Sequence, residues 1–263
     1  MGGDRLIPAK IAWPLAFIVV LITSGCIPAG AVSLETPTLT AVATTAPTPT
    51  ATIVWFPPTP TYTPRPTPAA PTPTPEMLPE HGELILEDDF SSGASWQLAQ
   101  STAGNIAVGK NRLNIAINQP RLLLSTIRST PEIGEFYLEV TAHPSLCSGM
   151  DEYGVILREA SEADFLRFAL SCSGQVRLDR ITGGAASSPQ PWTLSGAVPP
   201  GAPGVAQIAV WATAEEMRFF VNGQYQFSWN EPALLSGKLG LFARTAADSP
   251  VSVSFSDFRL YAP

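Results

Sequence analysis

Apolar and polar residues alternate one by one in many short runs between His81 and Pro263. The runs from Leu113 to Ile117 and from Phe136 to Val140 both follow this pattern. A period of two places every second side chain on the same face of a β-strand. Gly, Pro, Asn and Ser interrupt the runs, and no stretch of ten or more residues follows the period of a helix. We therefore expect residues 81–263 to form an all-β domain of about a dozen strands in two packed antiparallel sheets.

A Thr- and Pro-rich segment precedes this domain. From Thr36 to Pro75 about two thirds of the forty residues are Thr or Pro, and Arg65 carries the only charge. Proline lacks the backbone donor that helices and sheets need, so such a segment favours extended polyproline II. At roughly 3.1 Å per residue it would reach on the order of 120 Å. Residues 27–80 are therefore predicted to be a disordered linker that acts as a spacer.

The first 26 residues have the pattern of a targeting segment. Arg5 and Lys10 precede an apolar run from Ile11 to Ile22, which is shorter than the roughly 20 residues that span a bilayer. The run is followed by Thr23-Ser24-Gly25-Cys26, which resembles the cleavage box of bacterial lipoprotein signal peptides. That resemblance implies cleavage before Cys26, lipidation of Cys26 and an extracytoplasmic domain anchored to the cell membrane. Thr23 departs from the usual Leu, and the alternatives are ordinary signal-peptidase cleavage and an uncleaved anchor.

The cysteines fit an exported protein. If Cys26 carries lipid, Cys147 and Cys172 remain as an even pair, for which a disulfide is the default in an oxidising compartment. A hairpin centred on residues 159–164 would set Cys172 opposite residue 150 or 151, within reach of Cys147 through a loop. We therefore predict a Cys147–Cys172 disulfide, with two free thiols as the alternative.

Net charge argues against nucleic acid as a partner. Residues 81–263 hold twelve Lys or Arg against eighteen Asp or Glu, a net charge of −6, without a basic cluster. Phosphate binding needs a basic stripe. We expect no nucleic-acid partner.

The hairpin around Asn222-Gly223 can be paired in two ways. A strict two-residue turn would pair Phe220 with Tyr225 and expose an aromatic platform. A three-residue loop with a bulge at Gly223 would pair Phe219 with Tyr225 and leave one face apolar. We predict the three-residue loop, which places Tyr225, Phe227 and Trp229 in the core.

Several segments together resemble the concanavalin A-like lectin/glucanase jelly roll. They are Asp88-Asp89-Phe90-Ser91-Ser92 before Trp96, the runs YGVILRE and DFLRFALSCSGQVRLDR, the hairpin MRFFVNGQYQF and the ending GKLGLFARTAADSPVSVSFSDFRLY. The resemblance is greatest to the bacterial extracellular family labelled 3-keto-disaccharide hydrolase or domain of unknown function. It implies a jelly-roll sandwich, a fold that hosts lectins, hydrolases and inert spacers.

Catalytic motifs are missing from the sequence. Glucanases of this superfamily carry Glu-x-Asp-x-x-Glu on one strand, and the chain has no such motif. The clusters Asp88-Asp89 and Glu132–Glu135–Glu139 have other spacings. His81 adjoins the linker and His143 lies in a Thr-Ala-His-Pro stretch, so neither has the setting of a general base. We predict no catalytic residue and no zinc site.

Calcium is the one metal that the sequence suggests. Jelly-roll modules often bind a structural Ca²⁺ through carboxylates near the paired chain ends. Asp88, Asp89 and Asp257 are the candidate ligands. The alternative is an Asp-rich turn satisfied by its own backbone amides.

A ligand-binding surface is predicted on the outer side of the sheet formed by residues 136–180. A sugar site combines an exposed aromatic ring with planar hydrogen-bonding groups. The candidates are Tyr137, Glu139, Arg167, Arg177, Asp179 and, in a nearby Pro-rich loop, Trp192. The alternative is a salt-bridged sheet exterior with Trp192 folded over the sandwich edge.

Taken together, these features predict a surface-tethered, non-catalytic recognition module for a glycan or another extracellular polymer. The alternatives are a glycoside hydrolase of the 3-keto-disaccharide hydrolase type and a protein-interaction or spacer domain of an envelope assembly.

Overall fold

The computed structural model describes Met77, residues 79–246 and residues 250–263. The predicted signal segment with Cys26, and the Thr/Pro-rich run to Pro75, lie outside these residues, so those expectations stay predictions. None of the described residues belongs to a helix long and apolar enough to cross a membrane.

The described residues form fifteen β-strands in two antiparallel sheets, as the alternating pattern predicts. The nine-stranded sheet contains β1 (Leu84–Asp88), β2 (Ala99–Gln100), β3 (Gly104–Val108), β4 (Leu113–Ile117), β6 (Phe136–Leu146), β11 (Ala206–Ala212), β12 (Met217–Val221), β13 (Gln224–Trp229) and β15 (Val251–Tyr261). The six-stranded sheet contains β5 (Leu123–Ile127), β7 (Glu152–Ser161), β8 (Asp164–Ser171), β9 (Gln175–Thr182), β10 (Ala185–Leu194) and β14 (Lys238–Arg244).

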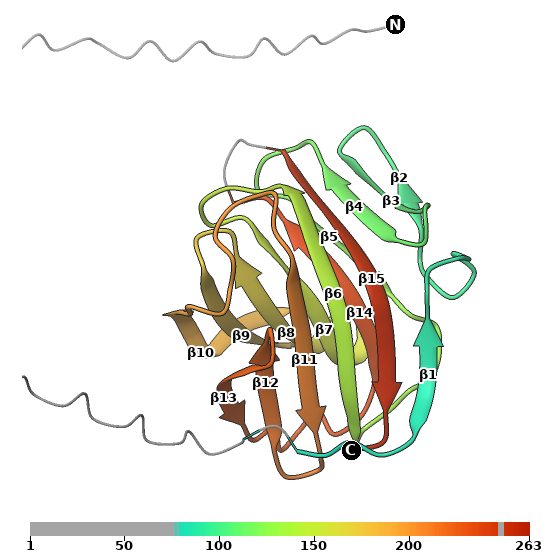
Figure 1. Cartoon of the computed structure of the whole chain (residues 1–263), viewed down its shortest axis with the longest axis vertical. Helices are drawn as coiled ribbons and strands as arrows, with labels where there is room; N and C mark the ends of the chain where they lie inside the picture. Colours follow the sequence, from blue (N-terminus) through green and yellow to red (C-terminus); the bar gives the residue numbers. More distant parts are fainter. Residues whose placement is uncertain (1–76, 78, 247–249) are drawn as a thin grey trace, which may run out of the picture. The chain divides into compact units, whose positions relative to one another are not determined.

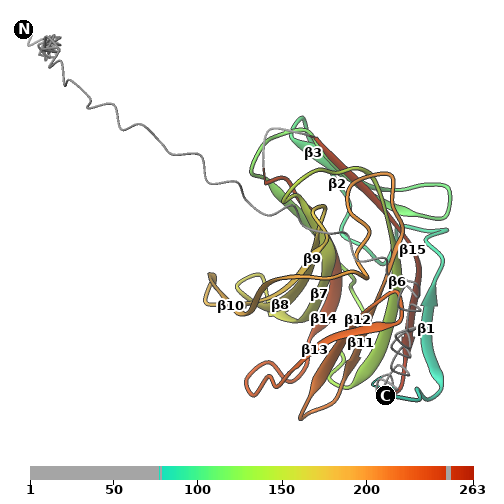
Figure 2. The same cartoon turned by 60° about the vertical axis from the view of Figure 1, so that its left-hand side comes forward.

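The two sheets pack face to face as a sandwich (Figures 1 and 2). Strand order is β13-β12-β11-β6-β15-β4-β3-β2 in the larger sheet, with β1 also paired to β15, and β10-β9-β8-β7-β14-β5 in the smaller one. Every second residue of the central strands points inward, and the inward side chains form one continuous core. Phe219 links the layers, since its ring lies 4.8 Å from that of Phe168 and 4.7 Å from that of Phe227.

The first and last strands of the domain lie side by side. β1 pairs with the end of β15. The Gly82 amide donates to the Ala262 carbonyl at 2.8 Å, and the Ala262 amide donates to the Glu83 carbonyl at 2.9 Å. The backbone therefore enters and leaves the described domain at one place.

The predicted disulfide is confirmed. β7 and β8 pair through Glu152 and Ser171, and the Cys172 amide donates to the Asp151 carbonyl at 2.9 Å, which is the register that the sequence indicates. Cys147 is bonded to Cys172, with their Cα atoms 5.8 Å apart. Such a bond is typical of oxidising compartments and is consistent with an extracellular location.

The predicted register of the β12–β13 hairpin is wrong at its turn. Val221 pairs with Gln224 and Phe220 with Tyr225, so the loop is the two residues Asn222 and Gly223, both with positive φ. The irregularity lies one step further, where Phe219 pairs with Phe227. Phe227 and Trp229 therefore return to the core side, while Tyr225 faces outward and is exposed.

Trp192 lies on an edge strand instead of in a loop. β10 pairs only with β9, and its register shifts twice between Ser187 and Thr193. Pro189 and Pro191 fall in this interval. Proline is tolerated on edge strands and at bulges because no ladder hydrogen bond is lost there.

Arg158 connects three loops at one end of the sandwich through hydrogen bonds. It is almost fully buried in a β7 irregularity and has a positive φ of 51°. Its guanidinium donates to the carbonyls of Gly134, Thr213 and Leu234 at 2.7–3.2 Å. One side chain thus satisfies backbone acceptors from three separate connections.

Candidate functional site

The outer face of the six-stranded sheet has an apolar floor. Ile127, Ile156, Ala169 and Phe242 are buried there, outside the main core, and Leu123, Phe165 and Trp192 pack against them. Two arginines cover this floor with their flat guanidinium groups: Arg167 lies 5.4 Å from the Phe242 ring centre and Arg177 lies 4.4 Å from that of Trp192. Guanidinium groups stack well on aromatic rings, so their orientation is fixed by packing as well as by charge.

Five charged side chains cross this floor as an arginine–carboxylate row: Arg167, Asp179, Arg177, Glu152 and Arg244. The Asp179 carboxylate binds Arg167 at 2.6 Å and Arg177 at 2.9 Å, and it accepts a hydrogen bond from Ser188 Oγ at 2.6 Å. Glu152 binds Arg177 at 3.1 Å and Arg244 at 2.8 Å. Both carboxylates are only 3% exposed. A carboxylate is tolerated in a buried position only when it is paired and hydrogen-bonded. The positions of these five side chains are therefore fixed before any ligand binds.

A pocket of about 430 Å³ opens beside the row on the same face. It is lined by Gln97, Leu123, Ser125, Ile127, Ile156, Glu159, Glu162 and Phe165. Ligand sites commonly have volumes of about 300–1,000 Å³ and combine an apolar lining with a few polar groups. Within the described part of the chain, the side chains of Gln97, Ser125 and Glu162 have no hydrogen-bond partner, so they can serve a ligand.

Glu159 has a perturbed acidity in this pocket. Partial burial raises the pKa of its carboxyl, and the nearby charges of Glu162 and Glu132 raise that pKa further. The ammonium group of Lys238 acts in the opposite direction without cancelling the rise in pKa. The Glu159 carboxyl therefore takes up a proton at a higher pH than an ordinary glutamate.

The predicted ligand surface is divided between the two sheets. Arg167, Arg177, Asp179 and Trp192 lie together over the six-stranded sheet. Tyr137 and Glu139 lie on β6, on the outer side of the nine-stranded sheet, where the Tyr137 hydroxyl donates to Glu139 at 2.8 Å. β6 pairs with β11 and β15 and not with β7, so the expectation that all six share one face is wrong.

The three predicted calcium ligands have partners within the protein. Asp88 binds Trp96 Nε1 at 3.0 Å and Arg128 Nε at 3.3 Å, and Asp89 accepts from the Ser91 amide at 2.9 Å. The Asp257 carboxylate accepts from Ser256 Oγ at 2.7 Å. Among the described residues no group of three His, Cys, Asp or Glu side chains is placed to hold a metal ion. The calcium site stays a prediction.

Sequence reasoning missed the pocket itself. Ile156 of the pocket and Glu152 of the neighbouring row were within reach, because they alternate with the inward residues of β7. Gln97 and Ser125 could not be found in this way, since they come from a loop and an edge strand whose neighbours depend on the sheet order.

Comparison with known proteins confirms the fold. No family model matches the chain, and no curated protein matches it in sequence. Among solved structures, the carbohydrate-binding module CBM66 from Bacillus subtilis aligns with a TM-score of 0.51 at 12% identity, covering 62% of this chain and 93% of that one. The catalytic domain of an endo-1,3-beta-glucanase (laminarinase) from Thermotoga petrophila RKU-1 gives 0.50 at 11% identity, covering 68% and 97%. A structure of the endo-acting O-glycanases that human gut microbiota express gives 0.52 at 13% identity, covering 68% and 99%.

These neighbours are jelly-roll β-sandwiches, and the chain shares their fold. Identities of this size establish architecture alone.

Proposed function

We propose that this domain binds a glycan in the pocket on the outer face of the six-stranded sheet, without cleaving it. The observation that carries the proposal is the pairing of an apolar floor with unpartnered polar side chains in one cavity of about 430 Å³. Carbohydrate-binding modules and glycanases among the structural neighbours support a glycan as the ligand class.

The pocket matches the two-sided chemistry of a sugar ring. The C–H face of a pyranose packs against Phe165 and the aliphatic side chains of the floor, which gains apolar burial. Its hydroxyl groups donate to Glu159 and Glu162, while Gln97 and Ser125 both donate and accept. The arginine–carboxylate row borders the pocket and offers the stacked pair Arg177 and Trp192 to a longer chain.

Two carboxylates of the face are unsuited to catalysis. Asp179 and Glu152 are each held by two arginines and are almost fully buried, so their oxygens are engaged within the row and do not face a ligand. The competing proposal is a glycoside hydrolase that uses Glu159 and Glu162. It is favoured by one observation, the raised pKa of Glu159 beside a second carboxylate, which is the usual property of a general acid.

The N-terminal segment leads to a proposal about location. A targeting sequence ending at Cys26 and a spacer of Thr and Pro would hold the domain outside the cytoplasm, and the Cys147–Cys172 bond supports that environment. Labelling intact cells with a radioactive fatty acid, with Cys26→Ser as the control, tests the anchor. Loss of label in the variant is expected, and an equally labelled variant contradicts lipidation at Cys26. A spacer or protein-interaction role would be indicated if no glycan bound.

Binding is tested with the full chain on a broad glycan array, followed by calorimetry with any ligand found. Phe165→Ala and Glu162→Gln are each expected to weaken binding about tenfold, or ~1.4 kcal/mol. Gln224→Ala, an exposed change on β13 of the other sheet, is the matched control and should leave affinity unchanged. If the correctly folded protein binds no glycan on the array, the proposal is contradicted.

Catalysis is tested separately with aryl-glycosides and keto-glycosides. No turnover is expected from the wild-type chain. Turnover that disappears in Glu159→Gln would instead establish the hydrolase.

A further inference from the structure

The outer side of the nine-stranded sheet is divided into an aromatic half and a polar half. Tyr137, Trp211, Phe220 and Tyr261 lie on the aromatic half, and Met77 packs over them. The polar half lies over β2, β3, β4 and the adjoining ends of β15 and β6. We call its outward side chains the polar array: Gln100, Asn105, Asn114, Thr141, His143, Ser252, Ser254 and Ser256.

Strand register arranges the polar array in rows. One row runs from Ala107 through Asn114 and Ser254 to His143. The next runs from Gln100 through Asn105 and Ala116 to Ser252, and Ser256 pairs with Thr141 in a third. Neighbouring strands lie about 4.8 Å apart, so hydroxyl, amide and imidazole groups repeat across the sheet at short intervals.

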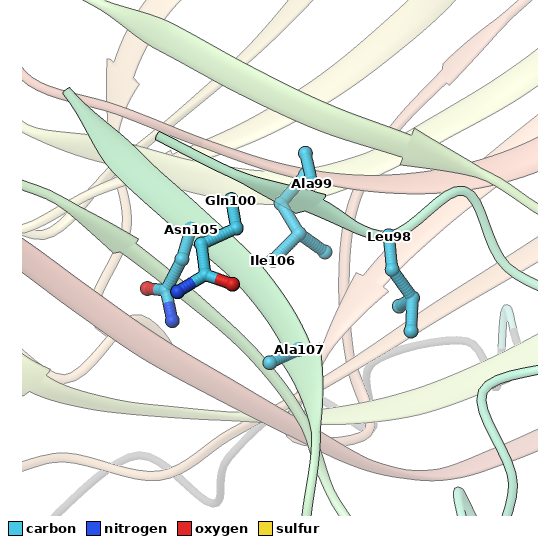
Figure 3. Close-up of a pocket in the computed structure, with 6 residues that line it drawn as sticks. All are labelled: Leu98, Ala99, Gln100, Asn105, Ile106 and Ala107. Atoms are coloured by element: carbon cyan, nitrogen blue, oxygen red, sulfur yellow. The ribbon is translucent and has the colours of Figure 1, made fainter. Parts of the chain in front are cut away.

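This half of the sheet has hollows where the side chains are small. Ala107 and Ala116 are the apolar residues of the first two rows. One hollow of about 390 Å³ lies over β2 and β3, where Gln100 and Asn105 stand next to each other near Ala107 (Figure 3). Another, of about 620 Å³, is lined by Gly109, Lys110, Arg112, Asn114 and Ser254. Ala107 pairs with Asn114, so the two hollows are neighbours.

Part of the hydrogen-bonding capacity is already used. Ser254 Oγ donates to Asn114 Oδ1 at 2.9 Å, and His143 Nε2 lies 2.9 Å from Ser256 Oγ. For the described residues, the side chains of Gln100, Asn105, Thr141 and Ser252 have no hydrogen-bond partner. The hydrogen-bonded side chains hold one another in position, and the four side chains without a partner can bind a ligand.

Two uncompensated cations border the array. Lys110 and Arg112 line the larger hollow, and neither forms an ion pair with any residue that the structure describes. By contrast, the arginines of the other face are all paired. Two acids on neighbouring segments engage polar groups: Asp257 accepts from Ser256 Oγ, and Asp89 accepts from Asn111 at 3.4 Å. In a chain of net charge −7, two unpaired cations beside one hollow favour a negatively charged ligand.

We propose that the polar array is a second binding site, for an acidic polysaccharide. Its carboxylate or sulfate groups bind Lys110 and Arg112, and its hydroxyl groups bind the amide and hydroxyl rows between β2 and β6. Arginine recognises the oxygen atoms of such anions through paired donors. The site goes beyond the proposed function and shares with it only the assumption that the ligand is a carbohydrate.

The test compares polygalacturonate with its fully methyl-esterified form, which has the same backbone without the charge. Calorimetry of the full chain should show binding to the acidic polymer that weakens as salt rises. The double variant K110Q/R112Q is expected to lose about tenfold in affinity, or ~1.4 kcal/mol, and most of its salt dependence. The exchanged variant K110R/R112K should keep salt-dependent binding. Circular dichroism and thermal unfolding of each variant confirm that it is folded.

Two further variants separate this site from the pocket on the other sheet. Asn105→Ala should weaken polygalacturonate binding, whereas Phe165→Ala should leave it unchanged. Equal affinity for the methyl ester, absence of binding to polygalacturonate, or loss of binding in Phe165→Ala alone would each overturn the second site. The two proposals can also fail separately. If no glycan on the array binds in the pocket, but polygalacturonate still binds in a manner that depends on Arg112, the proposed function is contradicted and the second site is supported.

Discussion

Arg158 shows how much of the fold can depend on one side chain. A buried guanidinium is costly unless its donors are satisfied, and here four donated hydrogen bonds end on three backbone carbonyls. Burial lowers the pKa of the Arg158 guanidinium, while Glu231 and Glu135 act to raise it. The loops through Gly134, Thr213 and Leu234 therefore meet around a cation instead of around apolar residues.

Replacing Arg158 by methionine should lower the free energy of unfolding by about 3–5 kcal/mol. The carbonyl groups lose their donors, and the buried carboxylate of Glu231 loses a neighbouring cation. Urea unfolding measures the change. Arg259→Met is the matched control: that arginine is 40% exposed in its pair with Glu87, so a loss of about 0–1 kcal/mol is expected. Equal losses in both variants would contradict the role of Arg158.

The raised pKa of Glu159 predicts a stability that depends on pH. A carboxyl whose pKa is higher in the folded state favours folding while protonated, and that contribution is lost as pH rises through the folded-state value. Glu159→Gln should therefore be more stable than wild type at pH 7 and nearly equal to it below about pH 4.3, the ordinary glutamate pKa.

Urea unfolding from pH 4 to pH 8 checks this expectation. Glu83→Gln, an exposed change, serves as the control and should show no such trend. A difference between Glu159→Gln and wild type that does not vary with pH would show that the carboxyl is not perturbed.

At the scale of elements, the β12–β13 hairpin shows what a local pattern can and cannot specify. Asn222-Gly223 is a strong signal for a two-residue turn with two positive φ values, and the structure has that turn. The alternation of apolar and polar residues argues for a longer loop, because a three-residue loop would place all bulky residues on one face of the hairpin. A bulge beyond the turn keeps the two-residue turn and returns Phe227 and Trp229 to the core side, while Tyr225 stays outward. No local feature of residues 219–227 marks the position of this bulge.

Gly223→Ala should cost about 1–2 kcal/mol of stability, because Gly223 has a φ of 72°, which an L side chain rarely adopts. A Cβ at this position meets open space, so the cost would be one of backbone strain alone. Gly196→Ala is the control: its Cβ also meets open space and its φ is not positive, so a change within about 0.5 kcal/mol is expected. Thermal and urea unfolding of both variants should agree, and equal effects would refute the strain argument.

Strand order decided which parts of the site could be predicted. Arg167, Arg177 and Asp179 were found because they lie on neighbouring strands of one meander, where the outward phase is readable from the sequence. Tyr137 and Glu139 were misplaced because β6 leaves that meander for the other sheet. Pro189 and Pro191 made β10 look like a loop, since nothing in the sequence marks it as an edge. Alternation specifies faces within a strand, but not which strands meet.

At the scale of the whole molecule, the Cys147–Cys172 bond stabilises the fold by restricting the unfolded chain. The two cysteines are 25 residues apart, and loop-closure entropy predicts a contribution of about 3.5 kcal/mol. Reduction should lower the free energy of unfolding by roughly that amount. Urea unfolding of the oxidised and reduced protein measures the difference, with Cys26→Ser under both conditions to exclude an effect of the third cysteine. An unchanged midpoint would contradict the prediction.

The adjacency of Gly82 and Ala262 has a consequence for engineering and for evolution. Because the backbone enters and leaves the sandwich at one place, a short peptide could join these positions while new ends are opened elsewhere, such as between Gly183 and Gly184 at the β9–β10 turn. For the same reason the domain could be inserted into a surface loop of another protein, since the two ends of that loop would need to move apart by only about a few ångströms.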